Sequence, residues 1–309
     1  MRIGILSRNP KLYSTRRLFE VSRERGHEVQ VIDTTTVAVH IGRDASPRGV
    51  AERRAMEKDQ VSGSTGLPRL DAIIPRIGTS VTFYGLAVVR QFETTGVVTT
   101  ASSRAIAFSR DKLQSLQVMA QAGLPIPRTA VIARPEALHA AVESVGGLPA
   151  VVKLIHGTQG RGVLLASRLA AISAILQRVE ELKRQAIIQE FISEADGRDW
   201  RLIVVGGRCV AAMERRAPAG DFRSNLHQGG TATRFQPDED TIELAILAAQ
   251  AHGLAVAGVD LLPSNRGPLL LEVNSSPGLE GIEETTGADV AGAIVDYVER
   301  AGRRRLRAY

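Results

Sequence analysis

Two acidic residues near the end of the chain, Asp260 and Glu272, are spaced so that they could share one chemical task. Each lies in an apolar, strand-like segment, and turn-forming residues at 263–267 separate the two segments, which predicts a β-hairpin. Folding this hairpin symmetrically about Arg266 puts the two carboxylates opposite each other, with their Cβ atoms roughly 4.5–5.5 Å apart. Like charges that face each other on a sheet are destabilising unless a cation lies between them. The alternative is a solvated hairpin face on which the two acids are incidental.

Asn274 joins this pair, because the period-two alternation of a strand puts it on the same face as Glu272. The same alternation predicts a core face made of Leu269, Leu271 and Val273. Carboxylate and amide oxygens are hard ligands, which suit Mg²⁺ or Mn²⁺ held together with waters and substrate phosphates. The hairpin therefore predicts a divalent metal site.

A glycine-rich segment and a lysine in the middle of the chain could hold phosphates. Residues 157–162 read Gly-Thr-Gln-Gly-Arg-Gly between two predicted strands, and they match neither the Walker pattern nor the dinucleotide fingerprint. Such glycines can still bring backbone N–H groups close to phosphates, although a plain glycine turn is the alternative. Lys153 precedes them within an apolar strand, where its charge must find an anion or its pKa must fall. A nucleotide phosphate would be such an anion.

Arginines in two turns could bind acidic groups. Arg215 and Arg223 belong to a polar loop that ends near residue 230, and guanidinium groups there could stabilise charge that develops during acyl or phosphoryl transfer. Arg76 follows a predicted strand and precedes a helix that we expect Thr79 or Ser80 to cap, so it could hold an acidic substrate together with free backbone N–H groups. Ordinary surface arginines and a plain strand-to-helix turn are the alternatives.

The elements that must position these residues fall into successive units, which predicts a mixed α/β and α+β fold. The first unit is α/β, and a polar segment at 42–69 interrupts it. In this unit we predict strands at 2–6, 28–33, 71–75 and 97–99 and helices at 14–25 and about 79–95. The second unit opens with a helix at 111–122 and has strands at 129–132, 150–154, 163–166 and 186–190, with one helix between the first two strands and another, ending near 184, before the last. The third contains two hairpins, 201–205 with 208–214 and 255–262 with 268–274, and helices at 238–252 and 289–300. We set the domain boundaries at 1–108, 109–191 and 192–302, followed by a basic tail at 303–309.

The composition agrees with a folded protein of this kind. The chain has 309 residues, 44% of them apolar and 23% charged, and a formal net charge of +6, which favours anionic partners such as nucleotides, acidic peptides and RNA. Collagen-like, disordered and short-repeat classes are excluded. No run approaches the roughly eighteen apolar residues of a membrane span, and no signal peptide is evident, so we expect a cytoplasmic protein without membrane or direct DNA contact. The single cysteine, Cys209, excludes an internal disulfide and is expected to be a buried thiol.

Taken together, these residues resemble the ATP-grasp ligases. The resemblance depends on Lys112, Lys153, the glycine segment, residues 189–191, and Asp260 with Glu272 and Asn274. Longer stretches, in the same order and covering nearly the whole chain, are similar to the RimK-like family of ribosomal protein modification ligases: residues 1–7, 75–78, 83–85, 110–113, 157–160, 221–227, 265–268 and 276–281. Two features depart from the family pattern, namely the long 42–69 region and the presence of Arg161 and Trp200 where aliphatic residues are expected.

The resemblance implies an ATP-grasp fold with an N-terminal pre-ATP-grasp domain. It implies ATP-dependent addition of L-glutamate to the C-terminal carboxylate of small-subunit ribosomal protein six. It also implies synthesis of free poly-α-glutamate as a second activity, and a homo-oligomeric enzyme. By similarity, the nucleotide is held by Lys112, Lys153, Glu190, Phe191, Asp199, Arg223, Ser224 and Asn225. Two Mg²⁺ or Mn²⁺ ions are assigned to Asp260, Glu272 and Asn274, substrate binding to Arg76, and charge stabilisation during catalysis to Arg215 and Arg223.

Two alternatives stay open at this point. One is a related ligase that acts on an amino-acid carrier protein or a glutamylated coenzyme, and analysis of the products would distinguish it. The other is a catalytically silent nucleotide-sensing or RNA-binding protein, which the basic tail and the positive charge suggest. Release of ADP that depends on an amino acid would exclude it.

Overall fold

The computed structural model describes residues 1–39, 41, 48–49, 69–154, 162–181, 185–218, 220–224 and 229–306. Asn225, most of the predicted glycine segment, most of the 42–69 region and the last three residues of the basic tail lie outside this set. No helix among the described residues is both long and apolar enough to cross a membrane.

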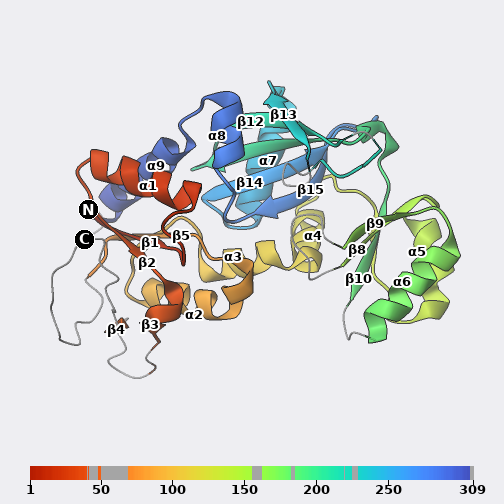
Figure 1. Cartoon of the computed structure of the whole chain (residues 1–309), viewed down its shortest axis with the longest axis horizontal. Coiled ribbons are helices and arrows are strands. Elements are labelled where there is room, and N and C mark those ends of the chain that lie inside the picture. The colour runs from red at the N-terminus through yellow and green to blue at the C-terminus, as the bar shows by residue number, and fades with distance from the viewer. Residues whose placement is uncertain are drawn as a thin grey trace.

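A parallel four-stranded sheet forms the N-terminal unit (Figure 1). In spatial order its strands are β2 (Glu28–Ile32), β1 (Arg2–Leu6), β5 (Ala72–Pro75) and β6 (Val98–Thr99). The helix α1 (Tyr13–Glu24) connects β1 and β2, as a parallel pair requires a crossover. A separate antiparallel pair consists of β3 (Val37–Ala38) and β4 (Arg48–Gly49). Because β1 and β5 are parallel and in register up to Leu6 and Pro75, the residues that follow both strands meet at one edge of the sheet.

The helix after β5 begins later than the sequence indicates. Residues Thr79–Val81 form a short 3-10 helix, and the α-helix α2 spans Thr82–Thr94 without a side-chain cap. The hydroxyl of Ser80 instead accepts a hydrogen bond from Arg8 at 2.7 Å. The predicted cap at Thr79 or Ser80 is therefore wrong, because these residues form a turn of their own.

Two capped helices lead into the central part of the chain. They are α3 (Ser103–Arg110), which the sequence analysis missed, and α4 (Lys112–Gln121). Asp111 ends α3 and caps α4, since its carboxylate accepts hydrogen bonds from two backbone N–H groups in the first turn of α4, both at 3.0 Å. Arg110 and Lys112 consequently flank a fixed bend.

An antiparallel four-stranded sheet forms a central lobe at one end of the molecule (Figure 1). Its strands, in spatial order, are β7 (Thr129–Ala130), β10 (Ala186–Glu190), β8 (Ala150–Leu154) and β9 (Val163–Ala166). The helices α5 (Leu138–Ser144) and α6 (Leu169–Glu181) pack on it and contribute, with the sheet, to one hydrophobic cluster. This lobe therefore has a core of its own.

A five-stranded antiparallel sheet forms the C-terminal lobe. Its strands, in spatial order, are β13 (Thr231–Arg234), β12 (Arg208–Arg216), β11 (Arg198–Val205), β14 (Val256–Leu262) and β15 (Leu269–Asn274). Its helices are α7 (Glu239–Ala251), α8 (Glu280–Thr286) and α9 (Val290–Leu306). The two predicted hairpins are confirmed, whereas β13 and α8 were not foreseen. The helix α9 continues through residues 303–306, so the start of the predicted basic tail is helical.

Two hydrophobic clusters join the N-terminal unit to the C-terminal lobe. One contains Leu6 and Ile73 from the N-terminal sheet together with Val259 from β14. The other contains Ile5 and Ile203, from the two sheets, with residues of α8 and α9. These two units therefore share their cores. Cys209 is half-buried rather than buried, and its thiol faces the backbone oxygen of Ala211 at 3.6 Å.

Candidate active site

The hairpin of β14 and β15 pairs Asp260 with Glu272, as the sequence predicts. A bulge directly after Asp260 shifts the remaining pairs by one residue, so that Leu261 pairs with Leu270. This shift buries Leu270 and leaves Leu271 half-buried, and the expectation that Leu271 belongs to the core is therefore wrong. The register at the two acids is unaffected, since the bulge lies on the turn side of the pair.

Asn274 completes a set of oxygen donors on this hairpin. It pairs with Gly258, two positions along the strand from Glu272, so the side chains of Asp260, Glu272 and Asn274 share one face of the sheet. In the described part of the chain, no group of three or more Asp, Glu, His or Cys residues is arranged to hold a metal ion. Two carboxylates and an amide fit a hard divalent cation that is shared with substrate phosphates, and they do not fit a closed structural site.

Two arginines supply the positive charge that opposed carboxylates need. Arg201 faces Asp260 across β11 and β14, and its Nε and Nη2 donate to the two carboxylate oxygens at 2.7 and 2.6 Å. Arg215, from β12, approaches the same carboxylate at 3.0 Å. Burial alone would raise the pKa of Asp260, but the charges of Arg201 and Arg215 outweigh it and lower that pKa. The sequence analysis missed Arg201.

Arg215 also belongs to a buried network that reaches the polar loop. Its Nε and Nη2 donate to the carboxylate of Asp199 at 2.6 and 2.7 Å, and its side chain is only 4% exposed. The hydroxyl of Ser224 donates to Asp199 at 2.5 Å, which ties the loop to the sheet. The structure thus brings Asp199, Arg215, Ser224 and Asp260 together, and the guanidinium of Arg215 is engaged with both carboxylates.

Glu272 has a different environment from Asp260. Its side chain is exposed, yet the surrounding protein removes part of its hydration, and this desolvation together with the charge of Asp260 raises the pKa of Glu272. The nearby cations, Arg201 and the two lysines Lys112 and Lys153, act in the opposite direction. An accessible carboxylate that is costly to ionise would be stabilised by a bound cation.

Lys112 and Lys153 come from two different elements and approach the same region. Lys112 opens α4 and donates to the backbone oxygen of Leu154 at 2.9 Å, while Lys153, on β8, donates to Gln189 Oε1 at 2.6 Å. Burial lowers the pKa of Lys153 to about 8; the charge of Glu272 opposes this change and that of Lys112 adds to it. Two cations and an accessible carboxylate in one place suit a polyanion that carries a metal ion.

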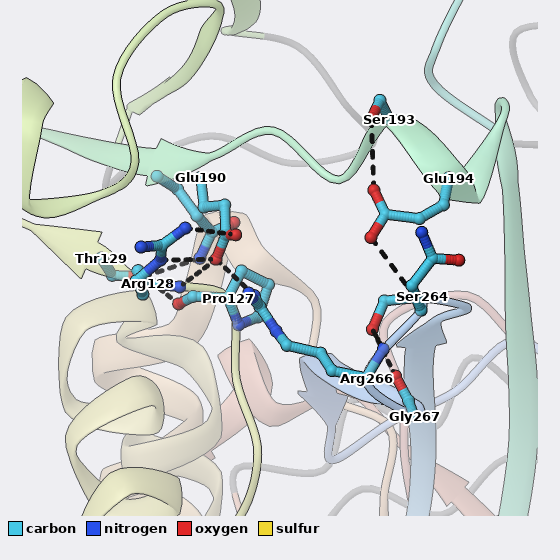
Figure 2. Close-up of polar contacts among 11 residues, drawn as sticks. Pro127, Arg128, Thr129, Glu190, Ser193, Glu194, Ser264, Arg266 and Gly267 are labelled. Atoms are coloured by element: carbon cyan, nitrogen blue, oxygen red, sulfur yellow. Dashed lines mark hydrogen bonds and ion pairs between the residues drawn. The ribbon is translucent and has the colours of Figure 1, made fainter.

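The predicted adenine segment lies between the central and C-terminal lobes. Phe191 packs edge-to-face on Phe222, with ring centroids 6.1 Å apart, so this segment contacts the polar loop. In the same loop Arg223 forms an ion pair with Asp221 at 2.7 Å. The carboxylate of Glu190 is held by two arginines rather than left open (Figure 2).

A cluster of arginines lies where β1 and β5 end. Arg76 follows β5, and the described residues offer its side chain no hydrogen bond or ion pair. Burial, with the like charge of Arg110, lowers the pKa of Arg76 to about 10. Arg110 donates to the backbone oxygen of Gly78 at 3.2 Å, and Arg8 reaches the same turn through Ser80. The sequence analysis missed Arg8 and assigned no role to Arg110.

The arginine cluster lies close to the metal-ligand face. Ser276 follows Asn274 by two residues, and its hydroxyl donates to the backbone oxygen of Pro75 at 3.3 Å, directly before Arg76. Arg110 and Lys112 lie on either side of Asp111, at the bend between α3 and α4. The arrangement thus joins Arg76, two lysines and a pair of carboxylates, which can bind an acidic substrate beside a nucleotide phosphate.

Comparisons with known proteins agree with this arrangement. The RimK PreATP-grasp domain matches residues 1–106, and the RimK-like ATP-grasp domain matches residues 109–298. The "Probable alpha-L-glutamate ligase 1" of Shewanella amazonensis is 48% identical over 305 residues, which is 99% of this chain and 97% of that protein. The "Probable alpha-L-glutamate ligase" of Pseudomonas aeruginosa (strain UCBPP-PA14) is 50% identical over 307 residues, which is 99% of this chain and 98% of that protein.

Solved structures share the fold. The ATP-grasp ligase PsnB complexed with minimal precursor has a TM-score of 0.72 and 22% identity, covering 97% of this chain and 98% of its own. A RimK domain protein ATP-grasp from Sphaerobacter thermophilus has a TM-score of 0.71 and 21% identity, covering 96% and 99%. The predictions of an ATP-grasp fold, of a pre-ATP-grasp N-terminal unit and of a ligase are confirmed. The chain belongs to the RimK-like ATP-grasp family of ligases.

Proposed function

We propose that this chain is an ATP-dependent α-L-glutamate ligase that lengthens an acidic acceptor. The observation that carries the proposal is the pairing of Asp260 with Glu272 beside Lys112 and Lys153, because it provides for a nucleotide polyphosphate and its cation in one place. The names of relatives 48–50% identical to the chain support glutamate as the amino acid.

The nucleotide would lie between the central and C-terminal lobes. Lys112 and Lys153 would hold its phosphates, and the segment at Glu190 and Phe191 would hold the adenine. The remaining contacts are proposed for Asp199, Arg223, Ser224 and Asn225. Asp260, Glu272 and Asn274 would hold two Mg²⁺ or Mn²⁺ ions, which when bound would offset the negative charge of the phosphates.

The reaction would proceed through an acyl phosphate. An oxygen of the acceptor carboxylate attacks the γ-phosphorus of ATP, and the bond from that phosphorus to ADP breaks. The amine of glutamate then attacks the acyl carbon, inorganic phosphate leaves with the carboxylate oxygen, and the amine loses a proton. Arg223 is proposed to stabilise the charge that develops in these steps. Arg215 stays a candidate for the same role, although in this structure its guanidinium contacts Asp199 and Asp260.

The acceptor is proposed to be the C-terminus of small-subunit ribosomal protein six. Arg76, supported by Arg8 and Arg110, offers a cationic surface for an acidic C-terminal residue, since a guanidinium that has no partner among the described residues favours a carboxylate. The main alternative acceptors are an amino-acid carrier protein and a glutamylated coenzyme, which would use the same nucleotide and metal residues.

Mass spectrometry of the products tests this proposal. The chain, ATP, Mg²⁺ and L-glutamate are incubated with purified ribosomal protein six, and in parallel with the same protein lacking its C-terminal residues. We expect mass increments of whole glutamate residues on the intact protein only, with one ADP released for each. Equal modification with glutamine would contradict the proposed preference for glutamate and favour another ATP-grasp ligase. No modification despite ADP release that depends on glutamate would favour a different acceptor.

A further inference from the structure

The carboxylate of Glu190 is enclosed by hydrogen-bond donors from two arginines (Figure 2). Arg128 donates from its backbone N–H and its Nε to Oε2, at 3.1 and 3.2 Å, and from its Nη2 to Oε1 at 2.9 Å. Arg266 donates from its Nη2 to Oε2 at 2.5 Å. Burial alone would raise the pKa of Glu190, but these bonds outweigh it and lower the pKa to about 2. The carboxylate is thus ionised and engaged on both oxygens.

The two arginines approach Glu190 from different parts of the fold. Arg128 directly precedes β7 in the central lobe, whereas Arg266 lies in the turn between β14 and β15 of the C-terminal lobe. The same turn makes a second contact with the segment after Glu190, because the backbone N–H of Asn265 donates to Glu194 at 3.4 Å. Figure 2 shows Arg266 reaching from this turn toward Glu190, and Glu194 near Ser264 of the same turn. The hairpin turn therefore holds this segment at two points.

This geometry limits what the side chain of Glu190 can do. Oε2 already accepts three hydrogen bonds and Oε1 accepts one, so the two arginines use most of the acceptor capacity of this carboxylate and leave little of it for the amino group of adenine. The backbone of the segment at Glu190 and Phe191 remains as the group that could recognise the base. We propose that Arg128 and Arg266 are positioning residues that fix this backbone through Glu190, and that they set the affinity for ATP and its preference over GTP. The inference rests on the ATP site of the proposed function.

The two arginines are suited to a clean test, because their side chains are 54% and 48% exposed while that of Glu190 is only 11% exposed. Exposed ion pairs contribute little to global stability, so Arg266→Ala should fold with an almost unchanged Tm. In the proposed ATP site this segment would contact the base and not the transferred phosphoryl group. Its displacement should therefore raise KM for ATP by about tenfold and leave kcat within about twofold.

The experiment measures kcat, KM for ATP, GTP and glutamate, and Tm for the wild type and four variants. We expect Arg266→Ala and Arg128→Ala to raise KM for ATP selectively, to reduce the preference for ATP over GTP, and to leave KM for glutamate unchanged. Arg266→Lys should restore part of the affinity, since it keeps the charge. The control, Arg178→Ala, removes an exposed ion pair with Glu181 in the same lobe and should change nothing.

The inference would be overturned if both alanine variants kept the wild-type KM for ATP and the wild-type preference. It would also be overturned if kcat, both KM values and Tm worsened together, because that pattern indicates general structural damage. These outcomes leave the proposed function intact, since the wild type would still use ATP. A wild type that binds no ATP would contradict the proposed function itself, and this inference with it.

Discussion

At the scale of single residues, Asp260 and Glu272 have opposite electrostatic surroundings although they face each other. Asp260 is buried and accepts hydrogen bonds from Arg201 and Arg215, whereas Glu272 is accessible and its pKa is raised by desolvation and by Asp260. A bound cation would change this balance most at Glu272, because that carboxylate has no arginine of its own among the described residues. Glu272 is therefore the residue at which the metal proposal is tested best.

We predict that Glu272→Gln reduces ligase turnover at least about 100-fold, since it removes a charged metal ligand while keeping the shape. Stability should not fall, because the fold disfavours the ionised form of Glu272 and the amide relieves repulsion from Asp260. Steady-state ADP release and thermal unfolding measure the two effects. Glu280→Gln, at an exposed position nearby, is the matched control. Wild-type turnover of Glu272→Gln at ordinary Mg²⁺ levels would contradict the assignment.

Lys153 should make ATP binding dependent on pH. Its pKa of about 8 in the free protein means that it loses its proton near that pH, and only the protonated form attracts a phosphate. We therefore expect ATP affinity to fall as pH rises above about 8, and ATP binding at pH 8 to be accompanied by proton uptake. Lys153→Met should weaken binding by about 10- to 100-fold and abolish the uptake.

Calorimetry in buffers of different ionisation enthalpy measures both the affinity and the protons taken up. Lys11→Met, at an exposed lysine, is the control and should behave as the wild type. An unchanged affinity in Lys153→Met would show that the lysine only supports the central lobe.

Local periodicity accounts for the site residues that could be predicted. Asp260, Glu272 and Asn274 follow from the alternation of one hairpin, and Lys153 from its position in an apolar strand. Arg201 could not be identified in this way, because its contact with Asp260 depends on the pairing of β11 with β14, which are separated by more than fifty residues. The sequence analysis also left Arg8 and Arg110 out of the cluster around Arg76, because both are far from Arg76 along the chain.

At the scale of elements, β12 carries two neighbouring arginines with different roles. Arg215 points into the buried network and is 4% exposed, whereas Arg216 is 52% exposed and lies 3.7 Å or more from its acidic neighbours. Adjacent positions on a strand face opposite sides of the sheet, which explains the difference. Substituting each of these two arginines therefore separates the effect of burial from the effect of losing an arginine.

We predict that Arg215→Ala lowers the free energy of unfolding by about 3–5 kcal/mol, because it leaves the carboxylates of Asp199 and Asp260 buried without their shared partner. Arg216→Ala should change it by less than about 0.5 kcal/mol. Chemical denaturation followed by circular dichroism measures both values. Equal, small effects of the two substitutions would indicate that the network contributes no net stability, and would leave catalysis as the role of Arg215.

Most long helices and paired strands were predictable, and the short elements were not. The start of α7 could be predicted from Asp238, a typical capping residue. Its carboxylate accepts a hydrogen bond from the backbone N–H of Thr241 and so caps the helix. The strand β13 has four residues and three of them are exposed, so no alternation marks it. The start of α2 was predicted too early, because Thr79 and Ser80 are typical capping residues but here belong to a 3-10 turn.

At the scale of the whole molecule, the N-terminal unit and the C-terminal lobe share two hydrophobic clusters, and a third lies within the central lobe. Ile187 of β10 links the central lobe to one of the shared clusters. The sequence analysis placed three consecutive units along the chain and could not show this grouping, because the contacts between the first and third units are long-range. The central lobe carries Lys153, and the shared core supports the metal-ligand face. The two halves of the proposed site therefore lie on largely different clusters, and we expect these clusters to differ in local stability.

Hydrogen exchange of two conservative core variants should reveal this separation. Ile172→Val, in the core of the central lobe, should accelerate exchange in β8 and β10 and leave β1 and β14 unchanged. Ile203→Val should accelerate exchange in both the N-terminal sheet and the C-terminal lobe, because they share that cluster. Each substitution is expected to cost about 1 kcal/mol, small enough to keep the chain folded. Uniform acceleration by both variants would contradict the separation.

The transfer of oxygen from acceptor to phosphate tests the central claim most directly. A peptide with the C-terminal sequence of small-subunit ribosomal protein six is labelled with ¹⁸O in its terminal carboxylate and incubated with the chain, ATP, Mg²⁺ and L-glutamate. If the carboxylate takes the γ-phosphoryl group before the amine attacks, and both of its oxygens are labelled, the first glutamate added to each peptide should release one inorganic phosphate that carries one ¹⁸O atom. Later additions use the unlabelled carboxylate of the new terminal glutamate and should release unlabelled phosphate. Mass spectrometry of the phosphate and of the lengthened peptide measures both. Addition of the first glutamate with only unlabelled phosphate, or with the label in AMP, would contradict the acyl-phosphate route and the ligase mechanism proposed for this site.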